Sequence, residues 1–153
     1  MARGWSRISP QSLVVPRALN NKFRLRMPPQ CGKCTALARV MTMTLATDQL
    51  ALYLITGWDI FPSSENTKLL DLIRRGCAES RAIHESPGHF FSLQDELLLN
   101  GLLSLSLYSP WDAILTNEAA EYAVEFSNDE FIDISCVDKF SDRFREIENW
   151  MAC

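Results

Sequence analysis

The chain has 153 residues, of which 47% are hydrophobic and 22% are charged, and this apolar content is ample for the core of one domain. Five cysteines, an odd number, occur without a secretory signal, which favours free thiols in a reducing compartment and argues against a disulfide framework. The formal net charge of −4 conceals two regions of opposite charge.

The charged residues are divided unevenly along the chain. Residues 1–47 hold eight of the 15 basic residues and no acidic residue, which gives a charge of +8. Residues 48–153 hold the other seven basic residues and all 19 acidic residues, which gives a charge of −12. We therefore expect a disordered basic leader over residues 1–43 and an acidic α+β domain over residues 44–153.

The predicted leader contains four of the seven prolines and shows no sustained hydrophobic periodicity. It is open to three interpretations: a wrongly assigned start, with Met41 or Met43 as the initiator, an organellar transit peptide, or a basic arm that contacts nucleic-acid phosphates. We expect a cytoplasmic protein, or an organellar one if the leader is a transit peptide. Nucleic-acid binding is not expected except through this leader.

Two helices are predicted after the leader. The first spans residues 48–57, where Thr47 can cap the N-terminus and Gly57 is a typical helix stop. The second runs from about Glu65 to about Ala82, with an apolar stripe on one side and charged residues on the other. A loop over residues 85–88 then leads into the most apolar part of the chain.

A helix that begins after Ser92 is the predicted centre of the core. Ser92 and Asp95 form a capping box at its start, and Ser109 followed by Pro110 ends it. Leucines cover most of its circumference, which is typical of a helix buried in a core. The apolar run is shorter than the roughly 20 residues that span a bilayer, so no membrane is expected. The narrow polar stripe consists of Glu96, Asn100 and Ser104.

Three short strands are predicted next, over residues 111–116, 122–126 and 131–136, because apolar residues recur there at a period of two. The acidic turn over residues 127–130 joins the last two strands. Residues 118–126 also fit the spacing of a helix, so a helix there is the alternative.

The chain ends in a predicted helix over residues 142–151, with Ser141 as its cap. The expected fold class is therefore α+β. It is a small single domain with three to four helices packed on a three-stranded antiparallel meander, behind a disordered basic N-terminal leader.

Cys31 and Cys34 have the C-x-x-C spacing of a redox pair or of half a zinc site. Locally a strand over 23–27 and a helix over 35–43 are conceivable, but the βαβ context that would make this motif informative is missing. A second C-x-x-C or a paired histidine motif, which a zinc site would need, is missing too. Chance spacing within a disordered leader is the simpler interpretation.

His84 and His89 flank Pro87 and Gly88, so they cannot share one helical face as the histidines of the H-E-x-x-H zinc motif do. We expect two loop histidines, no bound metal and no cofactor. No phosphate-loop, dinucleotide-binding or nucleophile-elbow fingerprint occurs either. The acidic residues near the C-terminus are interpreted as a solvated face.

These patterns favour a non-catalytic interaction or regulatory module that binds a protein partner. A domain charge of −12 would attract a basic protein partner. The alternative is a small enzyme or a metal or redox protein that uses the Cys31/Cys34 pair or the His84/His89 loop. A pocket that brings one of the histidines against an acid and a cysteine would favour this alternative.

Overall fold

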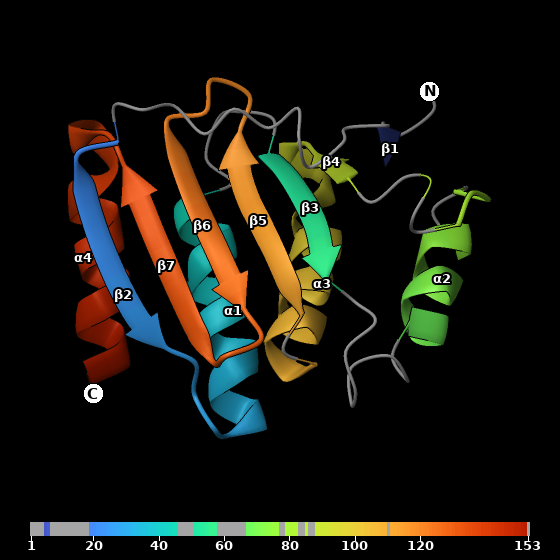
Figure 1. The fold of residues 1–153 in the computed structure, drawn as a ribbon, viewed down its shortest axis with the longest axis horizontal. Coiled ribbons are helices and arrows are strands. Elements are labelled where there is room, and N and C mark those ends of the chain that lie inside the picture. The colour runs from blue at the N-terminus through green and yellow to red at the C-terminus, as the bar shows by residue number, and fades with distance from the viewer. Residues whose placement is uncertain are drawn as a thin grey trace.

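The computed structural model describes residues 5–6, 19–45, 51–57, 67–76, 79–82, 85, 88–109 and 111–152. These residues form one antiparallel sheet with three helices on one of its faces, and a fourth helix beyond the end of the sheet (Figure 1). The fold is therefore mixed α+β.

Every neighbouring pair of strands in the sheet is antiparallel, and the strand order is β1-β4-β3-β5-β6-β7-β2. The first strand, β1, has only two residues, and each of the other six has four or more. The bounds are β1 Trp5–Ser6, β2 Asn21–Arg26, β3 Ala51–Gly57, β4 Gly88–Phe91, β5 Asp112–Asn117, β6 Tyr122–Ser127 and β7 Phe131–Cys136.

Helices occur where the last three were predicted, with different ends, and one further helix lies mostly in the segment expected to be a disordered leader. Helix α2 ends at Gly76, and a short 3₁₀ turn over Leu93–Asp95 precedes α3. The amide of Ser92 donates to Asp95 Oδ2 at 3.2 Å, which is one half of the predicted capping box. The bounds are α1 Cys31–Leu45, α2 Thr67–Gly76, α3 Glu96–Tyr108 and α4 Asp138–Ala152.

The predicted three-stranded meander is wrong, because β5, β6 and β7 are only the middle of a larger sheet. Residues 51–57, expected to be helical, form β3 instead. Positions 51 to 55 are buried on both faces of the sheet, so their apolar run has no period of two and resembles a buried helix. Residues 122–127 form β6, which excludes the helical alternative there.

The expectation of a disordered leader through residue 43 is wrong for residues 21–43, which form β2 and most of α1. In β2 the basic residues alternate with apolar ones, so Phe23 and Leu25 face the helices while Arg24 lies on the outer face. Arg24 there forms two hydrogen bonds to the Asp133 carboxylate, at 2.6 and 2.7 Å. The basic segment therefore supplies the edge strand of the acidic sheet.

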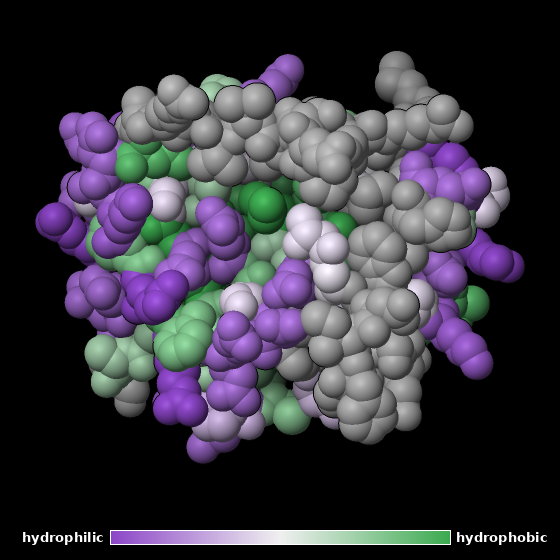
Figure 2. Space-filling view, in the orientation of Figure 1, coloured by the Kyte–Doolittle hydropathy of each residue, from purple (hydrophilic) through white to green (hydrophobic). Residues whose placement is uncertain are grey.

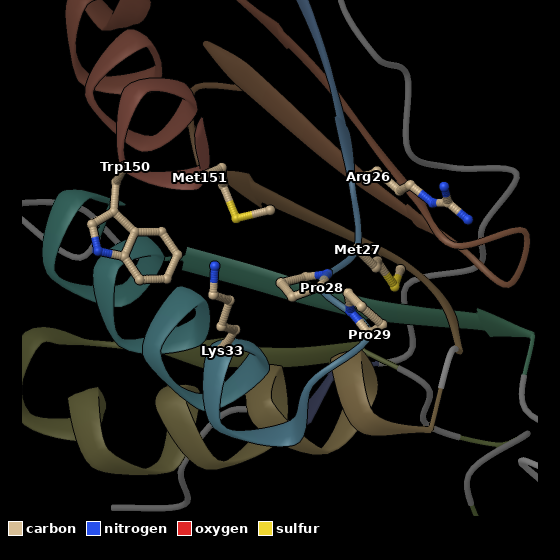
Figure 3. Close-up of a pocket in the computed structure, with 7 residues that line it drawn as sticks. All are labelled: Arg26, Met27, Pro28, Pro29, Lys33, Trp150 and Met151. Atoms are coloured by element: carbon tan, nitrogen blue, oxygen red, sulfur yellow. The ribbon is translucent and has the colours of Figure 1, made fainter. Parts of the chain in front are cut away.

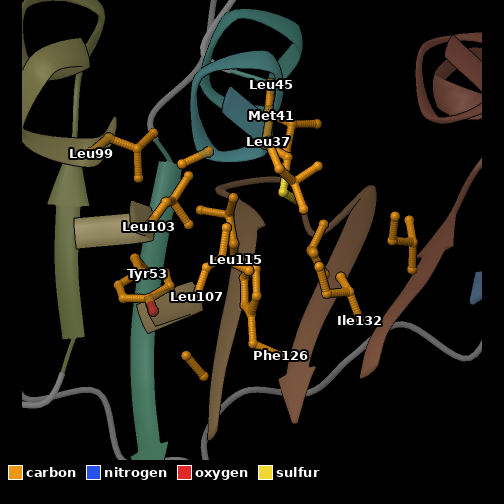
Figure 4. Close-up of a cluster of buried hydrophobic side chains, with 14 of the residues drawn as sticks. Leu37, Met41, Leu45, Tyr53, Leu99, Leu103, Leu107, Leu115, Phe126 and Ile132 are labelled. Atoms are coloured by element: carbon orange, nitrogen blue, oxygen red, sulfur yellow. The ribbon is translucent and has the colours of Figure 1, made fainter. Parts of the chain in front are cut away.

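The hydrophobic core lies between the sheet and the helices α1, α3 and α4 (Figure 4). Helix α3 is less enclosed than its sequence implies, because Leu97 is 89% exposed while Leu102 is fully buried. Within this core Ser106 of α3 is hydrogen-bonded to the hydroxyl of Tyr53 on β3. Both hydroxyl groups are buried, so their hydrogen bond fixes α3 against the sheet.

The opposite face of the sheet carries charged side chains toward the β2 end, where hydrophilic residues gather over β2 and β7 (Figure 2). Toward the other end Leu52 and Leu54 are buried on this face. None of the described helices is both long and apolar enough to cross a membrane.

Leu97 and Leu102, the most exposed and one of the most buried leucines of α3, give a test of how this helix packs. Replacing Leu102 with Ala removes buried apolar surface and leaves a cavity, so we expect the free energy of unfolding to fall by about 2–5 kcal/mol. Leu97→Ala is the control, since the same atoms are lost from a solvent-exposed position and the change should stay within about 0.5 kcal/mol. Urea denaturation of both variants measures the difference, and equal losses would contradict this packing.

Candidate functional site

Two cavities lie on either side of residues 27–29, where the chain passes from β2 into α1. The first has a volume of about 360 Å³ and is lined by Arg26, Met27, Pro28, Pro29, Lys33, Trp150 and Met151 (Figure 3). The second has a volume of about 180 Å³ and is lined by Met27, Pro28, Pro29, Cys31, Cys34, Leu107, Tyr108 and Glu130.

Backbone hydrogen bonds hold the segment between the cavities at both ends. The amide of Met27 donates to the carbonyl oxygen of Glu130 at 2.7 Å, which continues the pairing of β2 with β7 by one residue. The carbonyl oxygen of Gln30 accepts from the amides of Lys33 and Cys34, which starts α1. Proline fits between these two points, because it lacks an amide hydrogen and fixes its own φ angle.

The first cavity has apolar walls and one cation directed into it. Trp150 and Met151 at the end of α4 face Pro28 across the cavity, and Lys33 extends from the first turn of α1 into the space between them (Figure 3). Trp150 is 36% exposed, which is unusual for so large an apolar side chain. The Arg26 guanidinium points away from this group and lies 3.6 Å from the Glu130 carboxylate.

The second cavity contains both cysteines of the C-x-x-C motif. Cys31 is exposed and Cys34 is buried, and both are free thiols. The Cys34 Sγ–H donates to the carbonyl oxygen of Pro28 at 3.2 Å. Burial is the main cause that raises the pKa of the Cys34 thiol above its ordinary value, with the neighbouring Cys31 adding to the effect.

The predicted histidine pair does not meet these cysteines in the part of the chain that is described. His84 lies outside the described residues, and His89 is buried on β4, with its ring near those of Tyr53 and Phe91. Four strands separate β4 from β2, and His89 lines neither of the two cavities. His89 is therefore a core residue in the described fold.

No group of three or more histidine, cysteine or acidic side chains with metal-binding geometry occurs within the described ranges. Glu130 lines the cavity of Cys31 and Cys34, so an acid lies beside the cysteine pair, and no histidine is among the described residues that line this cavity. The described residues around Cys31 and Cys34 therefore do not supply the further ligands that a zinc site needs. The surroundings of the two cysteines suit free thiols instead.

Sequence reasoning missed the walls of the first cavity. Pro28 and Pro29 lie in the segment that was expected to be a disordered leader, and Trp150 lies in the helix predicted over residues 142–151. The cavity forms because α4 brings Trp150 beside residues that are more than 110 positions earlier in the chain. The only sequence signal was a tryptophan placed at the end of an amphipathic helix.

A polar cluster of Arg74, Glu79 and Arg81 lies at the C-terminal end of α2 and has a structural role. The Glu79 carboxylate accepts from the backbone amide and the guanidinium of Arg81, at 2.8 and 2.9 Å. The buried Arg74 donates to the carbonyl oxygen of Arg81 at 3.2 Å. The hydrogen bond from Arg81 is the main cause that lowers the pKa of Glu79 from 4.5 to about 2, and Arg74 adds to it.

This shift predicts an acid-sensitive contribution to stability. Because the folded pKa of Glu79 lies below its unfolded value, the stabilisation is present above about pH 5 and is lost as the pH falls toward about 2. We expect Glu79→Gln to lower the free energy of unfolding at pH 7 by about 1.5–3 kcal/mol, as for hydrogen bonds to charged groups. Urea denaturation of both proteins from pH 7 to pH 2 should show this gap closing, and a gap of constant size would contradict the assignment.

Comparison with known proteins adds no assignment to this geometry. No protein-family model matches the chain, and neither the curated proteins nor the solved structures give a significant match. The function is therefore argued from the two cavities alone.

Proposed function

We propose that the protein is a binding module for a segment of a protein partner that carries a large apolar side chain next to a carboxylate. The segment binds in the cavity between Trp150 and Pro28. The observation that carries this proposal is Trp150, which is 36% exposed in an apolar cavity that one lysine enters (Figure 3).

The walls of this cavity have the composition of a protein-binding hot spot. Tryptophan, methionine and arginine are enriched where partner proteins anchor, and Trp150, Met151 and Met27 supply two of these three residue types. Trp150 and the two prolines have few rotatable bonds, so little conformational entropy is lost when a partner covers them. A cavity of about 360 Å³ can accept one large apolar side chain.

The charge in the cavity favours an acidic group on the partner. Among the residues that the structure describes, Lys33 has no ion-pair partner. A carboxylate beside the apolar anchor would supply one, in a site where the walls exclude part of the water. The first turn of α1 carries Lys33, and a helix N-terminus also favours negative charge.

The acidic segment that we propose differs in charge from the basic partner expected from the sequence. That expectation depended on an acidic domain of charge −12 that is separate from the basic leader. Instead Arg24 and Arg26 of β2 lie against Asp133 and Glu130, so part of the acidic surface is neutralised within the fold. The cavity itself carries positive charge from Lys33.

A peptide-display experiment tests the class of partner. Selection of a random twelve-residue library on the full-length chain should enrich peptides in which Phe, Trp or Leu lies beside Asp or Glu. We expect Trp150→Ala to weaken binding of the selected peptides at least about tenfold, which is about 1.4 kcal/mol, because the main wall is lost. Lys33→Glu should remove the preference for acidic residues.

Two exposed residues outside the cavity serve as controls. Met43→Ala removes an exposed apolar side chain from α1, and Lys22→Glu makes the same charge change as Lys33→Glu on β2. Both should leave peptide affinity unchanged within about twofold. Selection of basic peptides, or binding that survives Trp150→Ala, would contradict the proposal, and so would enrichment of no peptide while a small organic anion binds.

A further inference from the structure

The second cavity supports an activity that does not depend on partner binding in the first. It contains two free thiols three residues apart, Cys31 and Cys34, at the start of the fifteen-residue helix α1. Residues three apart are neighbours on a helix surface, so the two side chains lie near each other in space. A small shift of the backbone in the first turn would bring the two sulfurs within bonding distance.

The two thiols differ in access. Cys31 is exposed and lies at the first helical position, since the carbonyl oxygen of Gln30 accepts the first hydrogen bonds of α1. Cys34 is buried one turn later, and its Sγ–H donates to the carbonyl oxygen of Pro28. A reagent that enters from solvent therefore meets the sulfur of Cys31 before that of Cys34.

The surroundings favour the same order of reaction. Cys31 lies in the first turn of α1, beside the positive end of the helix dipole, which favours nearby negative charge. Burial raises the pKa of Cys34, so this residue stays a thiol in the reduced protein. The cavity of about 180 Å³ is lined by both cysteines and has room for part of a small disulfide.

We propose that Cys31 and Cys34 form a reversible intramolecular disulfide by exchange with a small organic disulfide of the glutathione type, in which Cys31 reacts first and Cys34 second. In the first step the Cys31 thiolate attacks one sulfur of the small disulfide. The S–S bond breaks, a mixed disulfide forms on Cys31, and the other half leaves as a thiolate and takes up a proton.

In the second step Cys34 gives up its proton, and its sulfur attacks the sulfur of Cys31 in the mixed disulfide. The second half of the small disulfide then leaves as a thiolate and is protonated. The cysteine pair loses two electrons and two protons, and the small disulfide gains them as two thiols. A small thiol in excess reverses both steps.

The test uses the reduced full-length chain and oxidised glutathione as the probe. Samples are quenched with acid at increasing times, alkylated and mapped by mass spectrometry. We expect the Cys31–Cys34 disulfide to become the main product in the folded protein, and reduced glutathione to reverse it. Glutathione should appear on Cys31 at least tenfold faster than on Cys136, a fully buried thiol that serves as the internal control.

Two serine variants separate the roles of the cysteines. Cys34→Ser should accumulate the mixed disulfide on Cys31, because the second step is blocked. Cys31→Ser should slow modification of Cys34 at least tenfold. The wild-type map is decisive by itself if a variant does not fold.

Three results would overturn the proposal. The first is stable glutathione adducts on both cysteines of the wild type without an internal disulfide. The second is equal reaction rates at Cys31 and Cys136. The third is one zinc ion per chain in the purified wild-type protein and none in the Cys31→Ser variant. This result would make the cysteine pair half of a metal site.

Discussion

The pairing of β2 with β7 positions the first part of the chain on the rest of the fold. The two strands pair over six residues each, from Asn21 opposite Cys136 to Arg26 opposite Phe131. Backbone hydrogen bonds provide this pairing, and the bidentate contact of Arg24 with Asp133 adds to it on the outer face. The Arg24 hydrogen bond also lowers the pKa of Asp133, so this carboxylate stays charged to a lower pH than an ordinary aspartate.

Both cavities depend on this pairing because they share one wall. Residues 27–29 leave β2 at the end of the sheet and enter α1, with Trp150 of α4 on one side and Tyr108 of α3 on the other. Helix α1 then passes between α3 and α4, and Arg143 of α4 donates to the carbonyl oxygen of Thr44 at 3.3 Å. The thiol pair and the apolar cavity are therefore held by the same packing.

Local patterns in the sequence predict the parts of this fold that local interactions determine. The period-two runs that became β5 to β7, the contact of Asp95 with Ser92 and the amphipathic α4 are of this kind. Strand β3 was not predicted, because it is buried on both faces and so lacks the alternation of apolar and polar residues that identifies a strand. A strand over residues 23–27 was compatible with the local sequence, but the basic residues there were assigned to a disordered leader, whereas they occupy the outer face of the edge strand β2.

The candidate site was only half predictable for the same reason. The spacing of Cys31 and Cys34 is visible in the sequence, but the exposure of one and the burial of the other follow from tertiary packing. The cavity beside Trp150 is formed by residues 26–33 and 150–151, which are far apart in the sequence, and no local pattern predicts such a contact. His84 and His89 were considered as a possible site because they are close in sequence. In the described fold His89 is buried in the core, away from the cysteines.

Hydrogen exchange of the backbone amides tests most directly whether the basic N-terminal segment is part of the fold. If β2 and α1 belong to the cooperative core, the amides of Phe23 and Leu25, which point toward β7, and those in residues 37–41 should be protected to within about tenfold of those in β5 and β6. Exchange of residues 21–45 at the rate of an unfolded chain, with β5 to β7 still protected, would contradict the account. Both cavities would then lose the wall that they share.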